Sequence, residues 1–152
     1  MNENNETKEA YISDIDVNDI KKSISVLCVE DETIIMDSLE LVLKRRFDKI
    51  YTASNGKEGL DIFKNNPVDI VITDILMPVM DGVEMTHQIK EIRQDTPIIV
   101  LSAFNEEPFL KKMNDLGIYG YITKPFNRKD LFNTINIVAT DVYKQKNAII
   151  DS

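Results

Sequence analysis

The sequence has one cysteine, one histidine and no apolar run near the ~20 residues that cross a membrane. The single cysteine, Cys28, lies inside an apolar run, so we expect a buried thiol and no intramolecular disulfide. The single histidine, His87, lies mid-helix in our assignment, and we expect a surface residue rather than a phosphorelay histidine. These scarcities exclude a disulfide-stabilised fold and a membrane-spanning protein.

Positive charge is also scarce, because the net charge is -8. Binding to DNA or to anionic membranes without specificity needs a basic face, so we expect neither nucleic acid nor membrane as a direct partner. The first residues contain no basic stretch followed by an apolar one, which excludes a secretory signal peptide of the usual form. We therefore expect a cytoplasmic chain.

The length of 152 residues is typical of one domain. Residues 1–22 carry six acids and three lysines without a strong period, and we predict a flexible N-terminal extension. The alternative is a short docked helix, which would use the apolar residues Tyr11, Ile12, Ile15 and Ile20. We predict a folded domain over 23–144 and a C-terminal tail over 145–152.

Apolar runs alternate with helical patterns across the folded domain. We predict strands over 24–29, 49–53, 68–74, 98–101 and 120–123. We predict helices over 32–46, 54–64, 81–93, 106–116 and 127–144. Five β-α units with nearly continuous apolar strands predict an α/β fold, with a doubly wound parallel sheet covered by helices on both faces.

Polar side chains follow four of these strands at the edge where such folds build their sites. Glu30 and Asp31 follow the first strand, Asp74 ends the third, and Ser102 and Lys124 follow the fourth and fifth. Three converging carboxylates repel one another, and a divalent cation such as Mg²⁺ or Mn²⁺ relieves that repulsion. Asp74 can attack a phosphoryl group, with the hydroxyl, the ammonium and loop N–H groups binding its oxygens.

These residues carry a resemblance to a known family. The segments 29–32, 71–82, 101–103 and 121–125 resemble the receiver domain of two-component response regulators. The resemblance covers about 23–144 and implies a flavodoxin-like sheet of strand order 2-1-3-4-5. It implies that Asp74 is the phosphoacceptor. It also implies that Asp31, Asp74 and the Leu76 backbone carbonyl bind Mg²⁺ directly, with Glu30 binding mainly through water.

The resemblance implies three further roles. Ser102 would be the switch hydroxyl, Lys124 the phosphate-binding lysine and Tyr121 an aromatic rotamer switch. Two apolar residues, Leu76 and Phe104, occupy positions that flank the path of the hydrolytic water in this family, so we expect slow self-dephosphorylation. The output face would comprise 106–116, 120–123 and 127–144.

The predicted function is a phosphorylation-dependent switch that accepts a phosphoryl group from a histidine kinase or phosphotransfer protein. Such a chain is not an enzyme beyond weak Mg²⁺-dependent self-phosphorylation and self-dephosphorylation. One alternative is an aspartyl-phosphate phosphatase of the haloacid-dehalogenase type, but Leu76 stands where that type wants a second aspartate. Another is a phosphorylation-independent interaction module, but this chain keeps every residue that such modules usually lose.

The last predicted helix carries an apolar stripe, formed by Leu131, Ile135, Val138 and Val142. We expect this stripe to pack in the core. Gln145 and Ile149 keep its register, so a homodimer seam beyond Val142 is the alternative. The downstream partner or output domain does not follow from the sequence.

Overall fold

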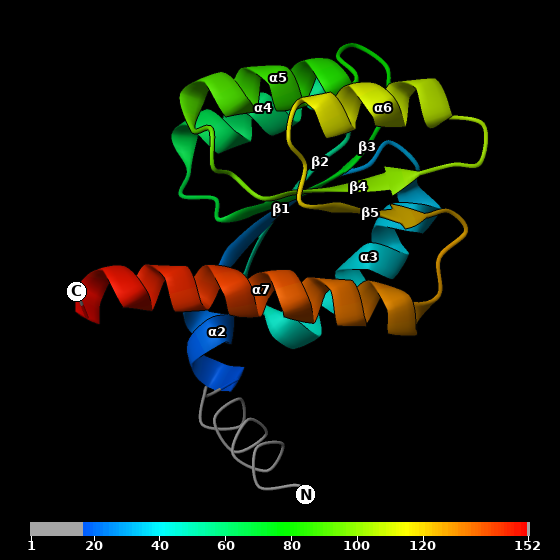
Figure 1. The fold of residues 1–152 in the computed structure, drawn as a ribbon. Coiled ribbons are helices and arrows are strands. Elements are labelled where there is room, and N and C mark those ends of the chain that lie inside the picture. Colours follow the sequence, from blue (N-terminus) through cyan, green and yellow to red (C-terminus); the bar gives the residue numbers. More distant parts are fainter. Residues whose placement is uncertain (1–16, 152) are drawn as a thin grey trace, which may run out of the picture.

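The computed structural model describes residues 17–151, and the side chains of residues 17–148. A five-stranded parallel sheet of order β2-β1-β3-β4-β5 lies between two layers of helices (Figure 1). The strands are β1 (Ser25–Val29), β2 (Lys49–Ala53), β3 (Ile70–Asp74), β4 (Ile98–Ser102) and β5 (Gly120–Thr123). The predicted fold class and strand order are confirmed.

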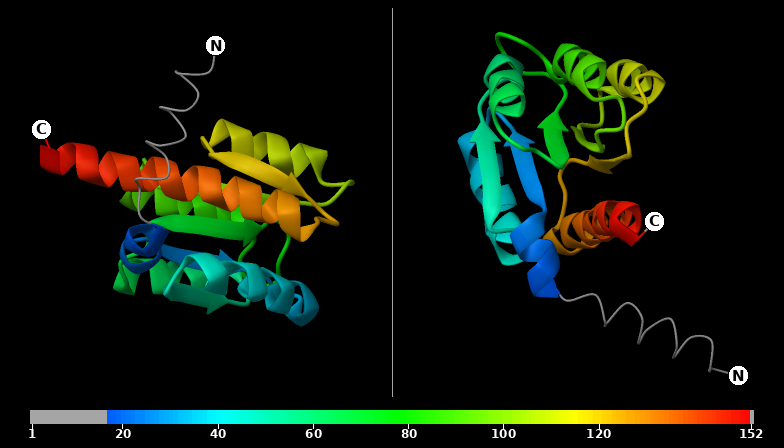
Figure 2. Two further views of the ribbon diagram at one scale, coloured as in Figure 1. Left: turned by 90° about the horizontal axis from the view of Figure 1, so that it is seen from below. Right: turned by 90° about the vertical axis from the view of Figure 1, so that its left-hand side faces the viewer.

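Helices lie on both faces of the sheet (Figure 2). One layer comprises α4 (Gly56–Asn65), α5 (Gly82–Ile92) and α6 (Glu107–Asp115). The other comprises α2 (Val17–Ser23), α3 (Thr33–Arg46) and α7 (Arg128–Asp151). All described strands and helices lie within a few residues of the predicted ranges, α2 and the end of α7 excepted.

The central strands are apolar throughout because both of their faces are buried. Alternate residues point to opposite helical layers. Toward α3 and α7 the sheet presents Val26, Cys28, Ile70, Ile72, Ile99 and Leu101. Toward α4, α5 and α6 it presents Leu27, Val29, Val71, Ile98 and Val100. These two clusters hold the strand ends rigidly, which is what positions the polar residues that follow them.

All but the last residue of helix α2 falls in the segment 1–22 that we predicted to be a flexible extension. Its Ile20 side chain is buried, and the Lys21 carbonyl accepts a hydrogen bond of 2.9 Å from the Asp48 amide. This supports the docked-helix alternative for Ile20. The other three residues of that alternative, Tyr11, Ile12 and Ile15, lie outside the described residues.

Helix α7 continues beyond its predicted end at Lys144 to Asp151. Its last turns are tied to the domain by Lys146, whose Nζ lies 3.0 Å from Asp69 Oδ1 and donates to the Ser23 carbonyl at 3.3 Å. Neither partner is close to Lys146 in the sequence, so the pattern of the helix could not predict these contacts.

Several smaller predictions are confirmed. The thiol of Cys28 is buried, His87 is exposed beside Glu91, and the stripe on α7 packs in the core. The side chain of Ile149 lies outside the described residues, so the homodimer seam stays a prediction. Among the described helices, none combines the length and apolar character that a membrane span requires.

Candidate functional site

Three carboxylates meet where β1 and β3 end. The two strands are neighbours, with Val29 paired to Thr73, so Glu30, Asp31 and Asp74 follow at one edge of the sheet. Each offers an oxygen within 4.8 Å of the others. Glu30 and Asp74 are buried, whereas Asp31 is exposed. An all-oxygen donor set with one solvent-facing member fits a hard divalent cation that keeps part of its water shell, such as Mg²⁺.

Lys124 joins this cluster from the far side of the sheet. Its Nζ lies 3.0 Å from Glu30 Oε2 and 3.2 Å from Asp74 Oδ1. Its backbone amide donates to the Ser102 carbonyl at 2.7 Å, which continues the pairing of β4 with β5 beyond Thr123. The ammonium is thus held between the two buried carboxylates.

Burial and charge perturb all three ionisable groups. Burial and the charge of Asp74 raise the pKa of Glu30 to about 7, although Lys124 opposes this rise. Burial also raises the pKa of Asp74, against the opposing charge of Lys124. Burial alone would lower the pKa of Lys124, but the two carboxylates outweigh it and the net shift is upward. The cluster therefore holds more negative charge than one lysine neutralises.

The backbone after Asp74 is fixed by close contacts. The Ile75 amide donates to Asp74 Oδ1 at 2.9 Å, and the Gly82 amide donates to the Ile75 carbonyl at 2.6 Å. A Cβ at Gly82 would lie 2.1 Å from the Asp74 carbonyl oxygen, so only glycine fits there. Asp81 caps α5 by accepting from the Glu84 amide at 2.9 Å. Glycine and the cap together set the orientation of Asp74.

The two predicted switch residues lie on neighbouring strands, Ser102 at the end of β4 and Tyr121 on β5. Ser102 is buried, and its hydroxyl makes only a long contact of 3.4 Å with the Ala103 carbonyl. The ring of Tyr121 is 54% exposed and lies at the surface of β5. Leu76 and Phe104 are 44% and 86% exposed. Both residues therefore face solvent in the loops that follow β3 and β4. The predicted roles of these residues, and of the Leu76 carbonyl, stay predictions.

Sequence reasoning missed Glu106. This carboxylate is only 6% exposed, and its Oε1 accepts a hydrogen bond of 2.7 Å from the Ala103 amide. Glu106 is the residue that precedes the first turn of α6, and its side chain makes no hydrogen bond to that helix. Its contact instead runs back to Ala103 across the turn before α6, so the spacing of a helix cap does not reveal it.

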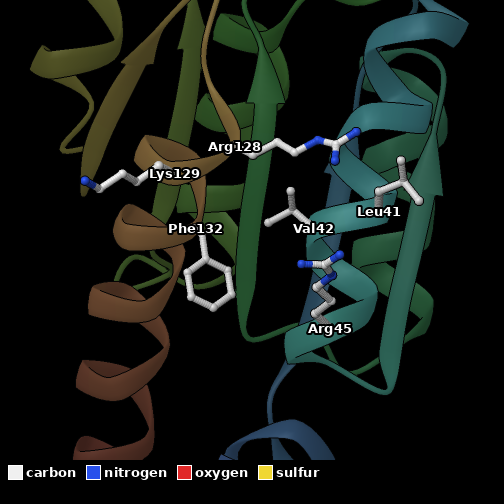
Figure 3. A pocket seen from close by; sticks show the side chains of 6 residues that line it. All are labelled: Leu41, Val42, Arg45, Arg128, Lys129 and Phe132. Carbon is white, nitrogen blue, oxygen red and sulfur yellow. The ribbon is translucent and has the colours of Figure 1, made fainter.

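A separate groove lies between α3 and α7, away from the carboxylates (Figure 3). It has a volume of about 290 Å³ and is lined by Leu41, Val42, Arg45, Arg128, Lys129 and Phe132. Figure 3 shows Arg128 reaching from α7 toward α3, with Arg45 on the facing helix. Within the described residues, no carboxylate pairs with any of the three cations of this groove. The groove is therefore a local excess of positive charge on an acidic chain.

Comparison with known proteins gives consistent results. The family model of the response regulator receiver domain matches residues 26–136. The chain is 36% identical over 115 residues to chemotaxis protein CheY of Halobacterium salinarum, which covers 76% of this chain and 96% of that protein. It is 34% identical over 113 residues to transcriptional regulatory protein YdfI of Bacillus subtilis, which covers 73% of this chain and 53% of that protein. The chain thus spans nearly all of the first relative and about half of the second.

The fold has solved counterparts as well. The N-terminal domain of an uncharacterized protein from Wolinella succinogenes is similar with a TM-score of 0.74 and 32% sequence identity. The match covers 83% of this chain and 98% of that chain. The similarity therefore extends over most of the sheet and the helices that cover it.

Proposed function

This chain belongs to the response regulator receiver domain family, and from that premise we propose that Asp74 accepts a phosphoryl group from a histidine kinase or phosphotransfer protein. The observation that carries the proposal is the placement of Asp74. Its carboxylate lies beside Lys124 and the two acids that follow β1, at an edge where the other strand ends add a buried hydroxyl. This arrangement offers a nucleophile and partners for the charge that it would acquire.

The transfer needs one bond to form and one to break. An oxygen of Asp74 attacks phosphorus, and the P–N bond of a phosphohistidine, or the P–O bond of acetyl phosphate, breaks with departure of the imidazole or acetate. Lys124 Nζ lies 3.2 Å from Asp74 Oδ1, so it is within reach of an oxygen on the incoming phosphoryl group. Ser102 is placed at the neighbouring strand end to donate to another oxygen after a movement of its loop.

Glu30, Asp31 and Asp74 would hold Mg²⁺, with the Leu76 carbonyl as a further oxygen donor. When bound, the cation would neutralise charge on the phosphoryl oxygens during transfer. The residues of the chain do the remaining work, because they orient the nucleophile and pair with the product. In this proposal the chain is a substrate of phosphotransfer and no enzyme beyond its slow self-phosphorylation and self-dephosphorylation.

We place the docking of the phosphodonor protein on the side of α3 and α7. A second concavity, lined by Ile34, Ile35, Ser38 and the segment 124–128, connects Lys124 with the basic groove through their shared residue Arg128. Ile34 is 81% exposed there. A partner with an apolar contact and acidic groups complements this surface, and docking there would bring its phosphohistidine next to Asp74.

The output in this proposal runs through the face of α6, β5 and α7. Movement of the Ser102–Ala103 loop toward a phosphoryl group would leave room for the exposed ring of Tyr121 to turn inward. The direct test of the proposed function is phosphorylation of Asp74 by a small phosphodonor with and without Mg²⁺. Loss of labelling in Asp74→Asn supports the assignment, and unchanged labelling overturns it.

A further inference from the structure

Glu106 is a buried carboxylate beside the phosphoacceptor, and the proposed function leaves it without a role. Within the described part of the chain, no lysine or arginine forms an ion pair with it. Its side-chain partner is the Ala103 amide, at 2.7 Å from Oε1. The pKa of Asp74 is raised first by burial and also by the charge of Glu106, so the two carboxylates interact.

The direction of the Ala103 amide follows from the pairing of β4. The Val71 amide of β3 donates to the Pro97 carbonyl, whereas the Tyr119 amide donates to the Ile98 carbonyl next to β5. Successive residues of a strand direct their backbone groups alternately to the two neighbours. Continued to the end of β4, this alternation places the Ala103 amide on the β3 side, where the carboxylates lie.

No backbone acceptor on β3 takes that amide. The next carbonyl in the ladder belongs to Ile75, and it already accepts from the Gly82 amide at 2.6 Å. The Ala103 amide is therefore a donor that points toward the side of the sheet where Asp74 lies, and its acceptor is the carboxylate of Glu106. An N–H group in this place is also a donor that an oxygen of a phosphoryl group on Asp74 can use.

We propose that Glu106 is an internal competitor for the Ala103 amide, which phosphorylation of Asp74 displaces. The inference rests on the proposed function and deepens it, because it names the residue that opposes the phosphorylated state. A phosphoryl group adds about 1.5 to 2 negative charges near neutral pH. It and the Glu106 carboxylate repel each other and compete for one N–H. The phosphoryl group is covalently held, so the Glu106 side chain is the group that leaves.

Displacement would reach α6 directly. The Glu106 carbonyl accepts from the Phe109 and Leu110 amides at 3.0 and 2.9 Å, and its amide donates to the Ala103 carbonyl at 3.2 Å. These bonds form the turn that begins α6, and the side chain anchors that turn to the end of β4. Loss of the anchor changes the first turn of α6, which belongs to the proposed output face.

A purely structural helix cap is the competing explanation. The chain provides a comparison at α4, where the carboxylate of Glu58 accepts from the Ser54 hydroxyl at 3.0 Å but is exposed, whereas the carboxylate of Glu106 is buried. A cap stabilises the fold without opposing phosphorylation. A competitor for the Ala103 amide does both, so the two explanations differ in the rate of labelling.

The experiment compares Glu106→Gln and Glu106→Ala with Glu107→Gln, an exposed neighbour that loses the same charge. Labelling of Asp74 by acetyl phosphate and Mg²⁺ is followed by intact mass, and the Ala103 amide resonance is followed by ¹⁵N NMR. Glu106→Ala removes the competing acceptor, so we expect it to be labelled about threefold to tenfold faster, as for loss of one intramolecular hydrogen bond. Glu106→Gln keeps an acceptor oxygen but loses the repulsive charge, so we expect it also to be labelled faster than the parent. Glu107→Gln should stay within about twofold of the parent, because an exposed charge on the same helix is screened.

Each outcome decides the inference. Parent-like labelling of both Glu106 variants, with a lower melting temperature in Glu106→Ala, identifies a cap and overturns the proposal. An Ala103 amide resonance that is unmoved by Glu106→Ala also overturns it, whatever the labelling. Absence of labelling in the parent and in all variants overturns the proposed function, and with it the displacement of Glu106. This holds even if the shift of the Ala103 amide resonance in Glu106→Ala verifies the contact between the two residues.

Discussion

Lys124 Nζ lies 3.0 Å from Glu30 Oε2, although 94 residues separate the two along the chain. Their strands, β5 and β1, are not neighbours, because β3 and β4 lie between them. The lysine therefore reaches across the end of the sheet and passes Asp74 on the way, at 3.2 Å. A phosphoryl group on Asp74 would be a stronger partner for Lys124 than Glu30 is. We therefore expect the ion pair of Lys124 with Glu30 only in the unphosphorylated chain.

The raised pKa of Glu30 predicts a pH dependence of stability in the absence of divalent metal. The pKa is about 7 in the folded chain, against 4.5 for an unperturbed group. Between these values the folded state binds a proton that the unfolded state lacks, so stability falls as pH rises from 4.5 to 7 and levels off above. Urea unfolding in EDTA at several pH values measures the slope.

The matched variant is Glu30→Gln, which keeps the size of the side chain and removes the titration. We expect its stability to fall less over the same pH range. Equal slopes in the parent and the variant would show that the carboxyl of Glu30 is not the group responsible.

Gly82 should resist replacement more than Gly120, the glycine of β5. In Gly82→Ala the new Cβ meets the Asp74 carbonyl oxygen at 2.1 Å, so the backbone of the phosphoacceptor must move. We expect a loss of roughly 2 kcal/mol or more in the free energy of unfolding, as for overpacking against backbone. Chemical denaturation measures this loss, and a slower labelling of Asp74 should accompany it.

Gly120→Ala is the control, because a Cβ at Gly120 meets no atom within 4 Å. Its free energy of unfolding should stay within about 0.5 kcal/mol of the parent, as for most surface substitutions. Similar losses in the two variants would contradict the close approach at Gly82.

Val79 adopts φ 71°, a left-handed backbone that a β-branched residue rarely takes, and its side chain is 77% exposed. Because little packing is lost on replacement, Val79→Asn should raise the free energy of unfolding by about 1 kcal/mol. Val79→Thr keeps the branched side chain and should gain nothing. A gain of the same size in both variants would exclude backbone strain as the cause.

The fold was accessible from the sequence because its evidence is local. Apolar runs bounded by turns predict five strands. At α4 the capping residue Asn55 lies three residues before Glu58, and its Oδ1 accepts from the Glu58 amide at 2.9 Å, a contact within one turn of the chain. The convergence of Glu30, Asp31 and Asp74 followed from one rule, that parallel strands end at the same edge.

What the sequence could not show depends on contacts between distant segments or on backbone angles. To predict the ion pair of Lys124 with Glu30, one would have to know the direction of the lysine side chain, which reaches across the ends of two strands. The anchoring of α7 by Lys146 joins three separate segments. The left-handed backbone angle at Val79 could not be predicted, because β-branched residues rarely adopt a positive φ.

The basic groove predicts a difference between protein and small-molecule phosphodonors. Arg45→Glu reverses one cation of the groove without touching the carboxylates of the site. Transfer from a histidine kinase that phosphorylates this chain should slow by about tenfold, because a complementary charge is lost, while labelling by acetyl phosphate stays unchanged.

Lys64→Glu makes the same charge change on α4, in the opposite helical layer, and should leave both rates unchanged. Equal slowing by Arg45→Glu and Lys64→Glu would indicate a general effect of net charge rather than docking at the groove.

The phosphoacceptor itself is tested most directly by mapping the labelled residue. The parent, Asp74→Asn and Asp81→Asn are incubated with acetyl phosphate and Mg²⁺, and intact mass is measured. Asp81 is the control, since it is the nearby acid that caps α5. We predict one added phosphoryl group on the parent and on Asp81→Asn, and none on Asp74→Asn. A parent that is never labelled, or an Asp74→Asn variant that is labelled like the parent, would contradict the account.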